Sequence, residues 1–113
     1  MSYIKDYIAA NESKMMEDLF SLIRIPSISA KPEHHDDMLA CAERWAQLLL
    51  EAGADEALVM PSKGNPIVFG QKIVDPAAKT VLVYAHYDVM PAEPLELWKS
   101  NPFEPEIRDG HIW

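Results

Sequence analysis

The chain has 113 residues, of which 49% are apolar and 25% are charged, as in ordinary soluble globular proteins. Its 18 acidic and 10 basic side chains give a formal net charge of -8, which argues against a nucleic-acid partner, because phosphate backbones attract clustered Lys and Arg. Cys41 is the only cysteine, so no internal disulfide can form. The sequence shows no signal-peptide pattern and no apolar run of membrane length, so we expect a soluble, cytoplasmic protein with no membrane partner.

Two helices are predicted in the first half of the chain. Asn11 can cap a helix whose apolar positions continue to Ile23, and residues 3–10 form either a shorter helix before it or the same helix with a kink. Residues 25–33 carry two prolines and are expected to be an irregular connection. A second helix is expected over residues 35–52, ending at a Gly53 cap. Its buried stripe is predicted to contain Leu39, Ala42, Ala46, Leu49 and Leu50, with Cys41 beside the stripe as a small, partly buried residue.

Strands are predicted after Gly53. Short apolar runs at residues 57–60, 66–69 and 80–85 are bounded by Pro, Gly and Asp. The third run is apolar at nearly every position, which favours a central strand covered on both faces. Asp109-Gly110 is a strong hairpin signal between predicted strands at 104–108 and 111–113. The fold class is therefore predicted to be α/β, with a mixed β-sheet packed with helices.

His86 and Asp88 are the candidate site residues. They follow the predicted central strand directly, and α/β folds place their sites at the carboxyl ends of such strands. In an extended chain both side chains point to the same side. Asp88 can then orient a metal-binding His86, or both side chains can approach one metal site. The short His-x-Asp pattern also fits a loop histidine with Asp88 capping a turn.

Other polar and aromatic positions have simpler interpretations. His34-His35-Asp36-Asp37 is interpreted as a helix start, because neighbouring helix residues do not face one another and Asp is favoured near a helix N-terminus. His111 is expected to be an ordinary strand residue. Trp98 and Phe103 either line a substrate cleft or pack the loop after Asp88, and packing is the favoured interpretation.

The residues around His86 resemble a known family. The stretch 81–91, Val-Leu-Val-Tyr-Ala-His-Tyr-Asp-Val-Met-Pro, resembles the first signature of the zinc peptidase family that contains aminoacylases, carnosinases, glutamate carboxypeptidases and succinyl-diaminopimelate desuccinylases. The stretches that resemble its dipeptidase branch, in the family's order and at its usual separations, are Ile-Pro-Ser-Ile-Ser at 25–29, Pro-Leu-Glu-Leu-Trp at 94–98, Asn-Pro-Phe-Glu-Pro at 101–105 and Ile-Arg-Asp-Gly at 107–110.

This resemblance implies that His86 binds one of two zinc ions, with cobalt or manganese as alternative metals, and that Asp88 orients His86 within the catalytic assembly. It implies that residues 1–113 are the N-terminal portion of an incomplete catalytic domain, and that the other ligands, the general base and a dimerisation domain lie elsewhere. The parent is then a homodimeric enzyme that hydrolyses dipeptides or other short peptides. Met90 departs from the polar residue common in the dipeptidase branch, which leaves the fine substrate preference open. The alternative is a non-enzymatic fragment or domain with the peptidase fold and no metal site.

Overall fold

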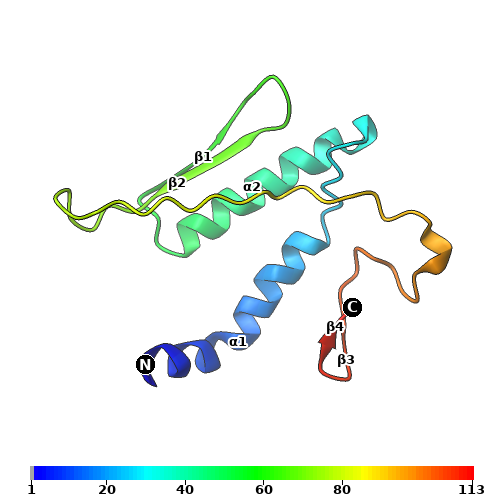
Figure 1. The fold of residues 1–113 in the computed structure, drawn as a ribbon, viewed down its shortest axis with the longest axis horizontal. Coiled ribbons are helices and arrows are strands. Elements are labelled where there is room, and N and C mark those ends of the chain that lie inside the picture. The colour runs from blue at the N-terminus through cyan, green and yellow to red at the C-terminus, as the bar shows by residue number, and fades with distance from the viewer. Residues whose placement is uncertain (1) are drawn as a thin grey trace. The chain divides into compact units, whose positions relative to one another are not determined.

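The computed structural model describes residues 2–113, which divide into two compact units. Residues 2–24 and 93–113 form one unit, and residues 25–92 form the other; the elements of both are labelled in Figure 1. In the described residues, no helix is both long enough and apolar enough to cross a membrane.

Helix α1 runs without interruption from Ser2 to Ile23. The predicted cap at Asn11 is wrong, because residues 3–10 belong to the same helix rather than to a shorter helix before it. Asn11 lies inside the helix, where its side-chain amide donates a 2.8 Å hydrogen bond to the Tyr7 carbonyl one turn earlier. Asn side chains bond to nearby backbone groups inside helices as well as at helix starts, so its presence did not mark a boundary.

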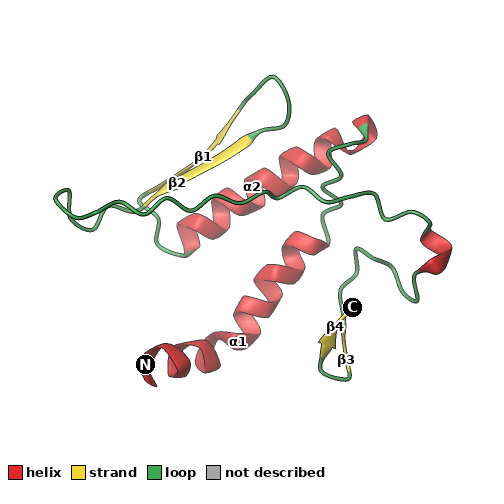
Figure 2. Ribbon diagram, in the orientation of Figure 1, coloured by secondary structure: helices red, strands yellow, loops and turns green. Residues whose placement is uncertain are grey.

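Helix α2 (His35–Glu51) and the antiparallel pair β1 (Glu56–Met60) and β2 (Ile67–Gln71) form the core of the unit at 25–92 (Figure 2). A 3-10 turn at Pro32–His34 precedes α2. Both strands pack on α2, and the approach is close at β2, where a Cβ added to Gly70 would lie 2.9 Å from Leu49 Cδ1. A lone two-stranded sheet is marginally stable in water, so this helix supplies the apolar surface that the hairpin needs.

The end of α2 confirms the predicted cap. Gly53 has a φ of 96°, a conformation that favours glycine. The Gly53 N–H donates to the Leu50 carbonyl and the Ala54 N–H donates to the Leu49 carbonyl, both at 2.9 Å. These two bonds form a Schellman motif, which satisfies carbonyls that the helix itself leaves without partners.

The buried face of α2 is shifted from the predicted stripe. Met38, Cys41 and Ala42 are buried, whereas Leu39 and Leu50, both predicted to be buried, are 40% and 51% exposed. The remaining two positions of the predicted stripe are half-buried. The apolar surface of this helix is wide, and its composition does not reveal which edge a neighbour covers.

The predicted central strand at residues 80–85 is not formed, and Figure 2 draws this segment as a loop. The side chains of Val81, Leu82, Val83 and Tyr84 are 83 to 91% exposed. A central strand exists only where strands on both sides satisfy its backbone N–H and C=O groups. No strand pairs with this segment within residues 2–113, so its apolar composition alone does not make it a strand.

The predicted hairpin near Asp109-Gly110 is confirmed, with shorter strands than expected. Strands β3 (Ile107–Arg108) and β4 (His111–Ile112) pair antiparallel, and His111 is a strand residue as predicted. Asp109 and Gly110 have φ values of 51° and 75°, and two consecutive positive φ angles are typical of the type I′ turn that Asp-Gly favours.

We expect the exposed run at 81–84 to make the chain self-associate, because contiguous exposed apolar surface favours association. Leu82→Lys should weaken the association by placing a charge in the run. Val74→Lys is the matched control, since Val74 is 88% exposed, Leu82 is 89% exposed, and only Leu82 lies in the run. Sedimentation velocity over a concentration series measures the effect. A monomer at every concentration, or equal effects of both substitutions, would contradict this expectation.

Candidate functional site

His86 and Asp88 are in contact, which is one of the arrangements that their spacing permits. Nδ1 of His86 lies 2.9 Å from Asp88 Oδ1 and 3.1 Å from the Asp88 backbone oxygen. Both oxygens are acceptors, so Nδ1 carries the hydrogen and Nε2 of the neutral ring keeps its lone pair. The His86 side chain is 80% exposed, so the ring is open to a ligand. A histidine held by a carboxylate in this way has the arrangement of a metal-binding histidine.

Ser29 binds the other oxygen of Asp88. Its Oγ donates a 2.6 Å hydrogen bond to Oδ2, across 59 positions of sequence. This bond lowers the pKa of the Asp88 carboxyl; partial desolvation opposes it, and the bond with His86 adds to it. Asp88 is therefore ionised at neutral pH and can accept from both neighbours. Ser29 lies in the Ile-Pro-Ser-Ile-Ser block at 25–29, to which the sequence alone assigns no site role, and its one signal is that this block accompanies the His-x-Asp block.

The backbone around Asp88 is fixed by the segment that follows α1. The Val89 N–H donates to the Ser27 carbonyl, and Ser27 Oγ donates to the Tyr87 carbonyl, both at 2.9 Å. Ile28 and Val89 form an isolated parallel bridge. Because Ser27 and Ile28 are only 2% and 4% exposed, these bonds hold the site segment against buried backbone.

Tyr87, between the two site residues, has its own partners. Its hydroxyl donates to the Pro66 carbonyl at 2.6 Å, and Cys41 Sγ lies 4.0 Å from the Tyr87 carbonyl. Burial raises the pKa of the Tyr87 hydroxyl, and the neighbouring Cys41 and Asp88 add to this. Burial also raises the pKa of the Cys41 thiol, although a hydrogen bond with Ser27 opposes it. A raised thiol pKa suits the packing role predicted for Cys41.

The His34–Asp37 segment is the start of α2, as predicted. Asp36 and Asp37 lie in the first turn, and His34 Nδ1 is 2.7 Å from Asp37 Oδ2. Within residues 2–113, no group of three or more His, Cys, Asp or Glu side chains is placed to hold a metal ion. The donor set at His86 therefore fits a metal ion as one ligand of a site, and the other ligands of such a site would have to come from outside these residues.

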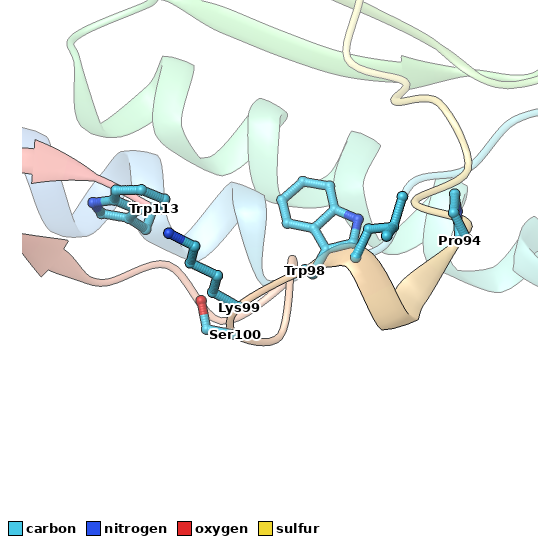
Figure 3. A pocket seen from close by; sticks show the side chains of 6 residues that line it. Pro94, Trp98, Lys99, Ser100 and Trp113 are labelled. Atoms are coloured by element: carbon cyan, nitrogen blue, oxygen red, sulfur yellow. The ribbon is translucent and has the colours of Figure 1, made fainter.

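Trp98 and Trp113 line an open, mostly apolar hollow in the unit of residues 2–24 and 93–113 (Figure 3). Lys99 and Arg108 lie over the Trp113 ring, 5.5 and 4.4 Å from its centroid, close enough for cation–π attraction. Phe103 is half-buried and does not line the hollow, which fits loop packing. The other lining residues are Pro94, Leu97 and Ser100.

No protein-family model matches the chain. Several curated proteins are similar to it. A cysteinylglycine-S-conjugate dipeptidase from Corynebacterium striatum is 31% identical over 103 residues, which cover 91% of this chain and 23% of that protein. A Cys-Gly metallodipeptidase from Candida albicans is 34% identical over 87% of this chain and 23% of its own length. A succinyl-diaminopimelate desuccinylase from Azoarcus sp. is 53% identical over 38 residues, which cover 33% of this chain and 10% of that protein.

A solved structure, that of the dipeptidase Dug1p from Saccharomyces cerevisiae, matches 89% of this chain and 23% of its own chain, with a TM-score of 0.78 and 26% identity. This match confirms the predicted α/β fold class. The chain spans 23% of the length of the first two curated relatives. Over the part of these relatives that it spans, the chain is similar to Cys-Gly metallodipeptidases and to succinyl-diaminopimelate desuccinylases, which confirms the family resemblance predicted from the sequence.

We expect the 113 residues alone to bind zinc only weakly, because a stable zinc site needs about three or four protein ligands and no group of three or more His, Cys, Asp or Glu side chains within residues 2–113 can hold a metal ion. Calorimetric titration with zinc should give similar weak isotherms for the chain and for its His86→Ala variant. A sub-micromolar, stoichiometric site that disappears in the variant would show that the chain holds a complete metal site.

Proposed function

We propose that this chain is the N-terminal part of a metallopeptidase that hydrolyses dipeptides or other short peptides, and that His86 binds one of its metal ions through Nε2. The contact between His86 and Asp88 carries the proposal, because it holds Nδ1–H and leaves the exposed Nε2 available. The relatives support the class of reaction, since two of them are named as dipeptidases and one of those as a metallodipeptidase.

The residues of this chain contribute positioning and electrostatics. When bound, zinc would polarise a scissile carbonyl and lower the pKa of a coordinated water toward neutrality. Asp88 holds the imidazole in one tautomer, and its negative charge makes Nε2 a stronger donor of electrons. The Val89–Ser27 backbone bond holds the segment next to Asp88, whose carboxylate lies beside Nδ1 of the ring. Asp88 thus acts through His86 and is a positioning residue.

Other features of the parent protein remain predictions. They are the use of two zinc ions, or of cobalt or manganese in their place, a homodimer formed through a further domain, and a cytoplasmic location. The acidic composition, with a formal charge of -8, supports the prediction that nucleic acid is not a partner.

The second candidate function concerns the 113 residues by themselves: they form a non-enzymatic fragment with the peptidase fold and no activity of its own. The observation that favours it is the absence, within residues 2–113, of a group of three side chains able to hold a metal ion. The two candidates are compatible, because an incomplete part of an enzyme has no activity until the rest of the site is supplied.

In the parent protein, His86→Ala should abolish dipeptide hydrolysis, because it removes a metal ligand. Asp88→Asn should lower metal affinity and turnover by about 10- to 100-fold, as is typical when the carboxylate that orients a metal-binding histidine is lost. Steady-state assays at a fixed zinc concentration, with Cys-Gly and with dipeptides that contain Ala or Gly, measure both effects.

His111→Ala is the matched control for these assays, since His111 is an exposed histidine in β4 whose Nδ1 lies 2.9 Å from the Asp109 backbone oxygen. It should leave turnover unchanged. Full activity of the His86→Ala protein would rule out His86 as a metal ligand.

A further inference from the structure

We propose that Ser29 is a positioning residue for His86, acting through Asp88. The three side chains form one line of hydrogen bonds that begins in the segment after α1 and ends at the exposed imidazole. The inference rests on the proposed function only in that a metal is expected to bind Nε2 of His86. The orientation of the ring concerns groups of this chain alone.

The carboxylate of Asp88 has one donor on each oxygen. Ser29 Oγ lies 2.6 Å from Oδ2, and His86 Nδ1 lies 2.9 Å from Oδ1. A hydroxyl-to-carboxylate distance of 2.6 Å falls in the range of strong charge-assisted bonds. The terminal torsion of an Asp side chain is broad, so a carboxylate held at one oxygen can still turn. With donors at both oxygens, the plane of the Asp88 carboxylate is fixed, and it presents Oδ1 to the ring.

Ser29 is itself held in place. It follows Ile28, which is 4% exposed and is bridged to Val89, the residue after Asp88. The hydroxyl and the carboxylate are therefore carried by two backbone segments that are tied to each other. The tie also makes the bond specific to position 29, because the hydroxyl of Ser27, two residues earlier, binds the Tyr87 carbonyl instead of the carboxylate.

A purely structural role for Ser29 has a different consequence. If its hydroxyl only joined the two segments, its loss would lower stability and leave the ring unchanged, because the Asp88 backbone oxygen, at 3.1 Å, still accepts from Nδ1. If Ser29 positions the ring, its loss lets the carboxylate turn and allows the Nε2–H tautomer, which has no lone pair on Nε2 for a metal.

The imidazole tautomer of His86 tests the proposal in the metal-free protein. Long-range ¹H–¹⁵N NMR of the histidine rings distinguishes Nδ1–H from Nε2–H directly. The wild type should show Nδ1–H. In Ser29→Ala the ratio of Nδ1–H to Nε2–H should fall several-fold, and in Ser29→Thr, which keeps the hydroxyl, it should stay near the wild-type ratio. Should Ser29→Ala fail to fold, Ser29→Cys, with its weaker donor, takes its place with the same expectation.

Ser27→Ala is the matched control, because it removes a serine hydroxyl from the same segment that bonds to backbone and not to Asp88. It should lower thermal stability and leave the His86 tautomer unchanged. An unchanged tautomer in Ser29→Ala, or an equal shift in Ser27→Ala, overturns the positioning role.

Zinc affinity of the parent protein separates this inference from the proposed function. Ser29→Ala should weaken zinc binding by less than the about 10- to 100-fold expected for Asp88→Asn, because it acts one residue further from the metal. If Ser29→Ala shifts the His86 tautomer but His86→Ala leaves zinc affinity unchanged, the metal-binding role of His86 is overturned and the positioning role of Ser29 stands. If His86→Ala loses zinc affinity but Ser29→Ala leaves the tautomer unshifted, the positioning role of Ser29 is overturned and the metal-binding role of His86 stands.

Discussion

The parallel contact between residues 27–29 and 87–89 is the constraint on which the candidate site depends. One backbone–backbone hydrogen bond and two hydrogen bonds from serine hydroxyls cross this contact, and they join segments about 60 residues apart. Closing so long a loop costs conformational entropy. The packing of β1 and β2 on α2, which all lie between the two segments, offsets that cost by burying apolar surface. The geometry around His86 is therefore a property of the whole unit at 25–92.

This constraint explains why an exposed histidine has a defined chemical state. His86 is itself 80% exposed, so its own packing does not fix the ring. Its orientation comes from Asp88, which is ionised and held on both oxygens. Exposure of the ring together with an anchored carboxylate suits a histidine that binds a ligand from outside these residues. A packed core histidine would show the opposite combination.

The features that local sequence determines were predictable. Helix α2, the cap at Gly53, the two strands after it and the Asp109-Gly110 turn follow from periodicity and turn chemistry, and the two-residue repeat of extended chain permits the contact of His86 with Asp88. The features that depend on distant neighbours could not be predicted from the sequence. The strand expected at 80–85 lacks partner strands, and the buried edge of α2 depends on what packs against it. Ser29 reaches the site only through the fold, because 59 positions separate it from Asp88.

Amide hydrogen exchange of the unit at 25–92 tests most directly whether the tether between residues 27 and 89 holds the site together. The Val89 N–H is bonded to the buried Ser27 carbonyl, whereas the exposed run at 81–84 has no strand partner within the described residues. The Val89 amide should therefore be strongly protected, the amides of Val81 to Tyr84 should exchange at nearly unprotected rates, and Ser27→Ala should accelerate exchange at Val89. Exchange at Val89 as fast as at Val81 to Tyr84 in the wild-type chain would contradict the account.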